Sequence, residues 1–166
     1  MPYTIYQAGP LFTSAERFFH HDLSARLRKA GHDVVWPGDL LSDAKIKATN
    51  GPVQLIFQSC KAALELCTCM VALLDGPQVD DGTAWEIGYA HAKGMPIYGI
   101  RTDTRVAGDT SQNRVNSMIE GCLAGVARDI DELIRMIGVE SGSEWVTGGR
   151  RSTDALTDIP RRKKGL

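Results

Sequence analysis

The sequence predicts an α/β protein built on a parallel β-sheet. Short apolar segments alternate along the chain with longer amphipathic ones, which is the pattern of strands joined by crossover helices. The clearest unit runs from Met70 to Gly94, where an apolar strand over Met70–Leu74 leads through an acidic loop, Asp75–Gly82, into a helix. Five strands in flavodoxin-like order would place the first and third side by side, with a ligand-binding edge between them.

The first half of the chain supplies two predicted strands and two predicted helices. Each helix has a start signal, since Ser14 can cap the first and Pro52 suits the first turn of the second. The segment from Leu40 to Gly51 is left unassigned. The predicted strands are Tyr3–Tyr6 and Asp33–Trp36, the helices are Ala15–Ala30 and Pro52–Leu66, and the expected core residues are Phe18, Leu23, Leu27, Leu55, Ile56, Ala63 and Leu66.

The second half repeats the alternation. Thr83 is expected to cap the helix that ends at Gly94, and Glu86 follows three residues later, at the spacing of a capping box. Glycine, serine, threonine and aspartate dominate after residue 140, so we expect one domain over 1–140 and a flexible basic tail over 141–166. The other predicted strands are Ile97–Ile100 and Gly125–Ala127, and the other helices are Asn113–Leu123 and Ile130–Ile137.

Composition restricts the classes of partner. The 166 residues carry a formal net charge of -1, with 43% hydrophobic and 23% charged residues, which is typical of a soluble globular protein. These values give no reason to expect nucleic acid or a membrane as the main partner, and no apolar run is long enough to span a bilayer. The cysteines and histidines lack zinc-ligand spacing, so we expect no metal and no other cofactor. The histidines are expected on the surface or in helices, and the cysteines as free thiols in a reducing cytoplasm.

Glu86 is the first candidate for chemistry. As a capping-box residue it would only accept a backbone hydrogen bond. As a functional residue it would be a carboxylate held ionised by the helix dipole, which suits a nucleophile. The pattern alone favours neither interpretation.

The loop before this helix is unusually acidic. Asp75, Asp80 and Asp81 can serve turns and caps, or they can surround a ligand. A ligand facing them should be neutral or cationic and hydroxylated, because carboxylates repel a phosphate. A Mg²⁺ site is a further alternative for such a cluster.

The turn after the first strand should face Glu86 if the first and third strands are neighbours. It carries Tyr6, Gly9 and Phe12. The rings of Tyr6 and Phe12 could stack on a planar base or belong to the core. The glycines form neither a G-x-G-x-x-G nor a Walker A motif, so a dinucleotide or nucleoside triphosphate cradle is unsupported.

Several segments share the motifs of a known family. They are YQAGPLF, VALLDG, DDGTAWEIGYAHAKG, PIYGIRTD and VNSMIEG. Together they resemble the nucleoside 2-deoxyribosyltransferase family over about residues 3–137, most specifically in the D-x-G-T-x-x-E-x-G-x-A pattern from Asp80 to Ala90. The resemblance implies a flavodoxin-like (Rossmann-like) three-layer α/β sandwich with a five-stranded parallel sheet, and transfer of 2-deoxyribose between nucleobases.

The resemblance also implies roles for single residues. Glu86 would attack C1′ of a 2′-deoxynucleoside, with Tyr6 positioning its carboxylate, and a second base or water would resolve the covalent deoxyribosyl ester, as in retaining glycosidases. Asp80 would hold the 5′-hydroxyl, and Asn116 would reach the sugar from a neighbouring subunit of a homo-oligomer. The position that reads the base in some members is Leu41, which leaves base preference open. The residues expected to bind the nucleoside or free base are Gly9, Phe12, Asp39, Asp75, Gly82, Asn116 and Met118.

Two other functions compete with transfer. One is hydrolysis of the N-glycosidic bond of 2′-deoxynucleosides or of their 5′-monophosphates, although the carboxylate of Asp80 argues against a phosphate. The other is a nucleotide-binding module without catalysis, against which the set of Glu86, Asp80 and Tyr6 argues.

Overall fold

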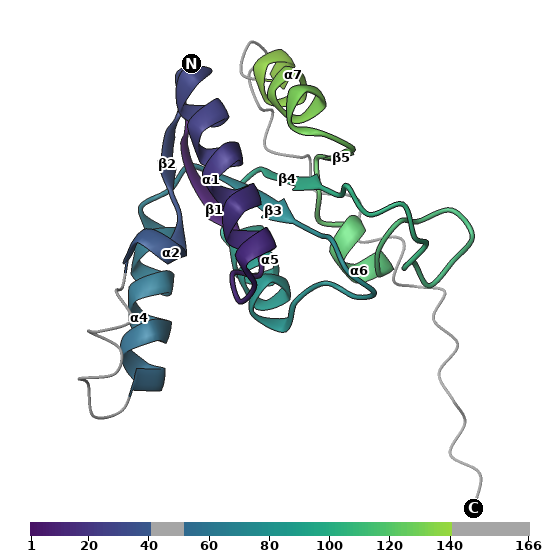
Figure 1. Cartoon of the computed structure of the whole chain (residues 1–166), viewed down its shortest axis with the longest axis horizontal. Coiled ribbons are helices and arrows are strands. Elements are labelled where there is room, and N and C mark those ends of the chain that lie inside the picture. Colours follow the sequence, from purple (N-terminus) through teal and green to yellow (C-terminus); the bar gives the residue numbers. More distant parts are fainter. Residues whose placement is uncertain (41–51, 141–166) are drawn as a thin grey trace, which may run out of the picture.

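The computed structural model describes residues 1–40 and 52–140, which form a five-stranded parallel sheet covered by helices (Figure 1). The strand order is β2-β1-β3-β4-β5, so the flavodoxin-like order predicted from the sequence is confirmed. The strands are β1 (Thr4–Ala8), β2 (Asp33–Val35), β3 (Cys69–Leu73), β4 (Ile97–Ile100) and β5 (Gly125–Ala127). The helices are α1 (Ser14–Lys29), α2 (Pro37–Leu40), α4 (Pro52–Glu65), α5 (Asp81–Ala92), α6 (Ser117–Glu120) and α7 (Ile130–Glu140).

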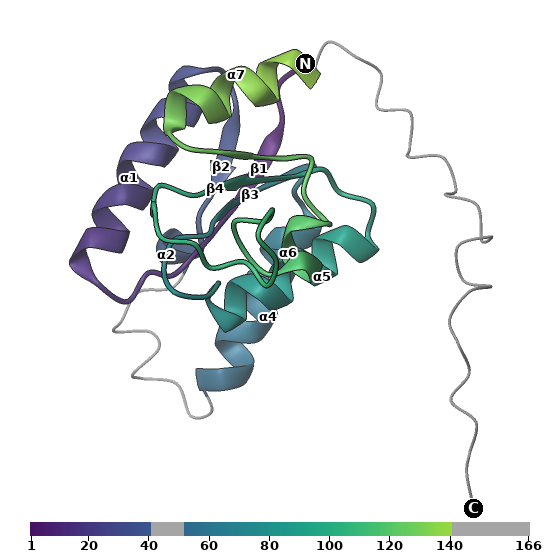
Figure 2. The same ribbon diagram turned by 90° about the vertical axis from the view of Figure 1, so that its right-hand side faces the viewer.

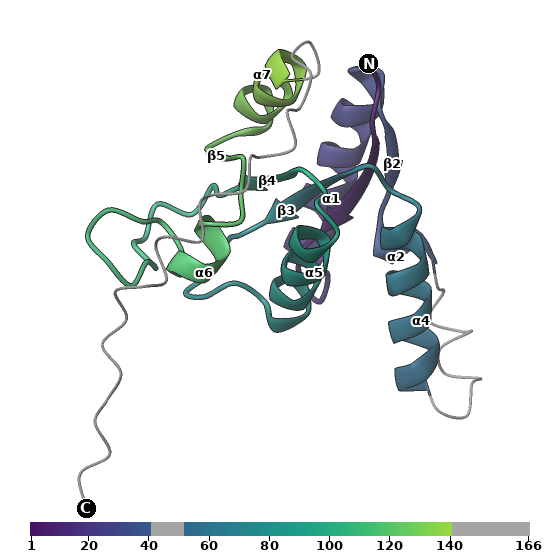
Figure 3. The ribbon, with the colours of Figure 1, turned by 180° about the vertical axis from the view of Figure 1, so that it is seen from behind.

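The helices lie in two layers, one on each face of the sheet. Figure 2 shows α1 and α7 on one face and α4 and α5 on the other. The same division appears in the core: Leu23, Leu27 and Leu133 pack on the first face, while Leu64 and Ile87 pack on the second. Seen from behind, α5 lies over the middle of the sheet, with α2 and α4 beside it (Figure 3).

The middle strands explain why the sheet is covered on both faces. Every residue of β3 is buried, as expected for a continuous apolar strand in a parallel sheet. In the register, Tyr6 of β1 lies opposite Met70 of β3, and Ala8 lies opposite Ala72. The loops that follow β1 and β3 therefore leave the sheet at the same edge.

Several predicted core positions are exposed. Phe18 is 78% exposed and Leu66 is 79% exposed, while Leu64, which was not predicted, is buried. These predictions are wrong because a helical pattern with apolar residues on more than one face does not fix which face meets the sheet. Ile56 is also largely exposed.

The predicted helix over Asn113–Leu123 is reduced to the single turn of α6. Side chains hold the preceding segment in a different conformation. Glu120 accepts hydrogen bonds from the backbone N–H groups of Arg114 and Val115, and Asn113 accepts one from the N–H of Thr110. Such local bonds compete with helix formation.

Some predictions concern residues outside the described ranges. The tail over 141–166, Leu41 and the unassigned segment before Pro52 belong to this group. Among the described residues, every helix is too short or too polar to cross a bilayer.

Candidate active site

Tyr6 and Glu86 meet on the face of the sheet that α5 covers. Tyr6 lies in the middle of β1 and is fully buried, and its hydroxyl donates a hydrogen bond to Oε1 of Glu86 at 2.6 Å. Glu86 lies in the second turn of α5 and is half-buried. The pair therefore joins two elements that are 80 residues apart in sequence.

The environment of Glu86 raises its pKa to about 7. Burial is the largest cause and the negative charge of Asp80 adds to it, while the hydrogen bond from Tyr6 acts in the opposite direction. The expectation that the helix dipole holds this carboxylate ionised is therefore wrong, because loss of hydration has the larger effect. At neutral pH Glu86 is divided between its two protonation states.

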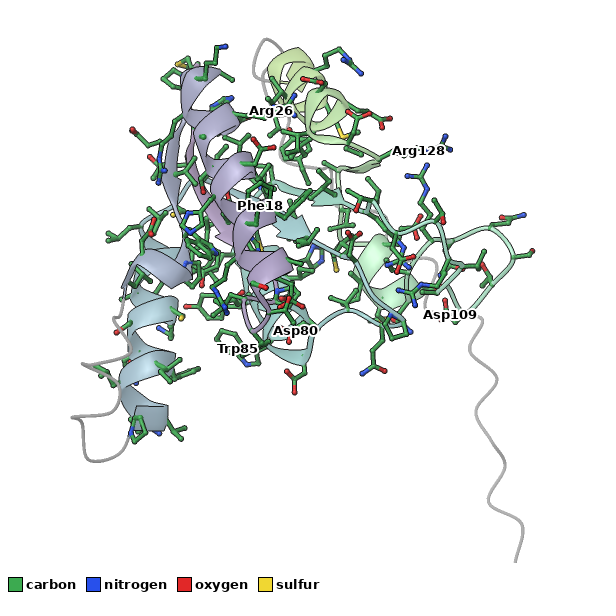
Figure 4. The ribbon with its side chains drawn as sticks, in the orientation of Figure 1. Phe18, Arg26, Asp80, Trp85, Asp109 and Arg128 are labelled. Carbon is green, nitrogen blue, oxygen red and sulfur yellow. The ribbon has the colours of Figure 1, made fainter. Side chains whose placement is uncertain are left out.

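Asp80, not Thr83, caps α5. The Asp80 carboxylate accepts hydrogen bonds from the backbone N–H and the hydroxyl of Thr83, both at 2.9 Å. Thr83 lies inside the helix and is buried, so the predicted capping box with Glu86 does not form. The side chain of Glu86 is thereby available to Tyr6. Figure 4 shows Asp80 and Trp85 together at this end of the helix.

Cys60 also belongs to this group, and its contact was not predicted from the sequence. Its half-buried thiol on α4 lies close enough to the Tyr6 hydroxyl to interact with it, and its pKa is raised first by burial and then by the charge of Glu86. Burial raises the pKa of Tyr6 as well, so the phenol stays protonated and acts as a donor. Only the packing of α4 against α5 brings Cys60 here, and no sequence motif marks it.

A buried polar network fixes the loop after β1. Gln7 donates to Nδ1 of His20 at 2.9 Å, and Ser24 donates to the carbonyl of the Gln7 side chain at 3.0 Å. With Nδ1 accepting, the other ring nitrogen of His20 carries the proton and donates to the carbonyl of Pro10 at 3.0 Å. His20 lies in α1, one of the two placements expected for the histidines, and it is buried rather than on the surface. The sequence offered one signal for this network: Gln7 lies in the largely apolar first strand, and a buried glutamine needs a polar partner such as His20.

Gly9 is required in this loop for two reasons. Its φ of 150° is disfavoured for other residues, and a Cβ there would lie 2.7 Å from the ring of His20. Phe12, further along the same loop, is 74% exposed and therefore does not belong to the core. Arg17 holds this part of the loop by donating to the carbonyls of Leu11 and Phe12, each at 2.9 Å.

The remaining predicted site residues are more dispersed. Asp75 accepts hydrogen bonds from the backbone N–H groups of Thr102 and Asp103, which ties the loop after β3 to the loop after β4. Asp39 is exposed on α2 and forms an ion pair with Arg28 at 3.8 Å. Asp81 bonds to the N–H of Gly82 and is exposed, so the three aspartates do not form one cluster with Glu86.

Asn116 and Met118 lie at α6, which packs beside α5. Asn116 caps α6 by accepting a hydrogen bond from the N–H of Met118 at 2.9 Å, and both side chains are exposed. Within the described part of this chain, the hydrogen bonds of Asn116 stay in its own loop, where its amide donates to Asp109 at 3.4 Å.

Cavities of about 300 and 510 Å³ lie elsewhere among the described residues, and neither of these is lined by Glu86. In residues 1–40 and 52–140, no group of three or more histidine, cysteine, aspartate or glutamate side chains is placed to hold a metal ion.

Fold and site define an α/β protein in which a tyrosine of the first strand and a carboxylate of the helix after the third strand form a pair on one face of a parallel sheet. The sequence profile of nucleoside 2-deoxyribosyltransferase matches residues 5–118, more than half of the chain. The chain therefore belongs to the nucleoside 2-deoxyribosyltransferase family, as the motifs predicted. A comparison with curated protein sequences finds no match.

Solved structures share the fold. A conserved protein from Enterococcus faecalis V583 is 26% identical, with a TM-score of 0.72 over 84% of this chain and 99% of that one. The 2-deoxyribosyltransferase of Bacillus psychrosaccharolyticus is 21% identical, with a TM-score of 0.66 over 79% of this chain and 90% of that one. The CMP N-glycosidase of Clostridium botulinum is 17% identical, with a TM-score of 0.53 over 82% and 98%.

Proposed function

We propose that this protein transfers 2-deoxyribose between nucleobases through a covalent intermediate on Glu86. The observation that carries the proposal is the 2.6 Å hydrogen bond from Tyr6 to a half-buried glutamate whose pKa is about 7. A carboxylate in such a position is ionised in a large fraction of molecules at neutral pH, yet it is poorly hydrated. Both properties favour nucleophilic attack.

The proposed reaction has two displacements. In the first, an ionised oxygen of Glu86 forms a bond to C1′ while the N-glycosidic bond breaks, and the departing base keeps the bonding electron pair. In the second, a ring nitrogen of another base attacks C1′, the ester bond breaks, and the carboxylate is restored while the incoming base loses its proton to solvent. Tyr6 orients the carboxylate in both steps by donating its hydrogen bond.

The sugar would be held from both sides. We assign Asp80 to the 5′-hydroxyl, because its carboxylate lies close enough to raise the pKa of Glu86 and is half-buried at the start of α5. Gly9, Phe12 and Gly82 would line the approach to the base, and Asn116 with Met118 would complete the site of a neighbouring subunit. We assign no direct contact with the substrate to Asp75, because both of its carboxylate oxygens accept hydrogen bonds from Thr102 or Asp103, whereas Asp80 binds Thr83 through one oxygen. Asp39 is also left out, since it lies on α2 and pairs with Arg28.

Hydrolysis is the second candidate. A structural neighbour is a CMP N-glycosidase, so the same fold also occurs in a protein that acts on a nucleoside monophosphate. Water would replace the second base in that reaction. We favour nucleosides over monophosphates here, because the Asp80 carboxylate would repel a 5′-phosphate.

The deciding experiment is a matrix of reactions. Each of several 2′-deoxynucleosides is incubated with and without a free base, and the products are separated by chromatography. A new deoxynucleoside that appears only with the added base supports transfer, and free deoxyribose alone would support hydrolysis. Parallel reactions with the corresponding 5′-monophosphates test the assignment of Asp80.

The first prediction concerns Glu86→Ala. We expect turnover to fall by about 10³-fold or more, since loss of a covalent nucleophile removes the whole pathway. Folding should be retained, because the residue is half-buried and lies on a helix where alanine is favourable. Circular dichroism and the product assay measure the two properties, and wild-type turnover in this variant would exclude the mechanism.

A further inference from the structure

A cavity of about 510 Å³ lies at the ends of β4 and β5, apart from the pair of Tyr6 and Glu86. Arg101 follows β4 and Arg128 follows β5, and the N–H of Arg101 donates to the carbonyl of Ala127 at 2.9 Å. Two arginines therefore leave neighbouring parallel strands side by side, at the edge where α/β sheets bind ligands. In Figure 4, Arg128 lies well away from Asp80 and Trp85.

Positive charge predominates in the lining. The lining contains four guanidinium groups, from Arg101, Arg105, Arg114 and Arg128, and one carboxylate, from Asp103. Three further carboxylates, those of Asp75, Glu120 and Glu132, bond to backbone N–H groups of lining residues and offset part of this positive charge. Nε of Arg105 binds both oxygens of Asp103, at 2.9 and 3.0 Å, and this pairing holds the pKa of Asp103 well below its usual range. Within residues 1–40 and 52–140, neither Arg114 nor Arg128 forms an ion pair.

Arg101 is a buried cation without a full counter-charge. It is 4% exposed, and its guanidinium donates to the carbonyls of Leu74, Gly76 and Arg105. Its nearest carboxylate oxygen, on Asp103, is 3.8 Å away and is shared with Arg105. Nε of Arg101 is buried and has no hydrogen-bond partner among the described residues. Because an uncompensated buried charge is costly, an anion beside it would be stabilising.

We propose that the cavity lined by Arg101, Arg114 and Arg128 binds the phosphate group of a small phosphorylated molecule. Guanidinium groups bind phosphate oxygens through paired hydrogen bonds, and those of Arg114 and Arg128 form no ion pair within the described ranges. Arg114 is held in place by its bond to the carbonyl of Val126 at 3.0 Å, so part of the site is preorganised. The volume is that of a small-molecule pocket, so it leaves room for a sugar or nucleoside attached to the phosphate. The site is independent of the chemistry at Glu86.

Isothermal titration calorimetry at constant ionic strength tests this site. The probes are inorganic phosphate, ribose 5-phosphate and unphosphorylated ribose. Arg128→Gln is the informative variant, because Arg128 is exposed and no bond of its guanidinium supports the described fold. Arg135→Gln is its control, because it removes the same charge from an exposed position of α7 outside the cavity.

We expect saturable binding of both phosphates and none of ribose. Arg128→Gln should weaken binding about tenfold or more, while Arg135→Gln should stay within about twofold of wild type. Arg128→Lys should bind with intermediate affinity, since it keeps the charge and loses the paired geometry. Glu86→Ala should bind phosphate like wild type, which separates this site from the proposed reaction.

Three outcomes would overturn the proposal. The first is no saturable binding of either phosphate up to about 10 mM. The second is an equal loss in Arg128→Gln and Arg135→Gln, which would indicate a general effect of net charge. The third is ribose binding as tightly as ribose 5-phosphate.

Discussion

For a single residue, the hydrogen bond from Tyr6 is expected to set the pH range in which Glu86 is reactive. If Glu86 attacks only when ionised, kcat/KM should rise with pH through an acid limb centred near the pKa of about 7 and then level off. In Tyr6→Phe the stabilising donor is lost, so the limb should move to higher pH and the rate at about pH 6 should fall about tenfold or more. Steady-state rates across this range measure both effects.

Tyr89→Phe is the matched control for that experiment. The Tyr89 hydroxyl also donates to a carboxylate, that of Glu65, but on the exposed surface of α4 and α5. Its removal should leave the acid limb where it is in the wild type. A flat profile in wild type, or equal shifts in both variants, would contradict the role of Tyr6.

The raised pKa of Glu86 should also make the free energy of unfolding depend on pH, and Glu86→Gln should remove that dependence. The folded pKa is above the unfolded value, so unfolded chains release this proton first and unfolding becomes more favourable as pH rises from about 4.5 to about 7. At about pH 4 the variant and wild type should be equally stable, and at about pH 8 the variant should be more stable by about 3 kcal/mol. Urea denaturation at the two pH values measures the difference.

Glu16→Gln provides a control of opposite sign. Hydrogen bonds from the Thr13 backbone lower the pKa of Glu16, so its contribution is present near neutral pH and is lost on acidification. The substitution should therefore destabilise the protein at neutral pH and have less effect in acid. If the effect of Glu86→Gln on stability does not depend on pH, the carboxylate is not perturbed in the way that its burial indicates.

At this scale the sequence identifies types of residue but not their partners. The motif from Asp80 to Ala90 was enough to single out Glu86, and Tyr6 was identified by the family resemblance of the segment at the end of the first strand, before the turn at Gly9. Cys60 was not predicted as a neighbour of Tyr6, because the rotation of α4 about its axis decides that contact. The expectation that the helix dipole keeps Glu86 ionised was also wrong, because burial by residues distant in the chain raises its pKa.

For a whole helix, the same side chain can serve both stability and function, and Asp80 is the example. As the N-cap of α5 it stabilises the helix, and under the proposed function it also binds substrate. Asp80→Ala should lower stability by about 1 kcal/mol and should also lower kcat/KM by about tenfold or more. Chemical denaturation and steady-state kinetics on the same preparation separate the two effects.

Thr13→Ala is the control, because Thr13 caps α1 in a complete capping box with Glu16. It should lose a similar amount of stability, about 1 kcal/mol, and keep its activity. If Asp80→Ala keeps the wild-type kcat/KM, Asp80 only caps α5 and does not bind substrate.

Helix beginnings show where sequence reasoning stops. At both α1 and α5 two suitable capping residues compete, Thr13 with Ser14 and Asp80 with Thr83, and the residue nearer the N-terminus is the cap. Ser14 was therefore the wrong prediction for α1, because the capping box of Thr13 with Glu16 satisfies two donors at once. The spacing from Thr83 to Glu86 imitates the same motif, but Tyr6 binds the glutamate instead.

For the whole molecule, the order of strands was predictable because alternating strands and helices restrict the topology to few choices. That order alone brings the loops after β1 and β3 together and predicts where the site lies. The position of α6 was not predictable, because side-chain bonds of Asp109, Asn113 and Glu120 shape the loop before it. Arg26 of α1 also binds Asp131 of α7, a contact between elements that no local pattern indicates.

The last prediction concerns sites shared between subunits. Asn116 caps its own α6 and is exposed, which leaves it accessible to a second copy of the chain. If each site combines Glu86 of one subunit with Asn116 of another, Asn116→Ala and Glu86→Ala should each be inactive, yet mixed oligomers should contain sites with both residues intact. For a dimer reassembled at random, about a quarter of the wild-type rate should return. Mixing Glu86→Ala with Glu86→Gln is the control and should restore nothing, because every hybrid site lacks the nucleophile. No recovery in the first mixture, or full activity of wild type as a monomer in analytical ultracentrifugation, would show that each chain carries a complete site.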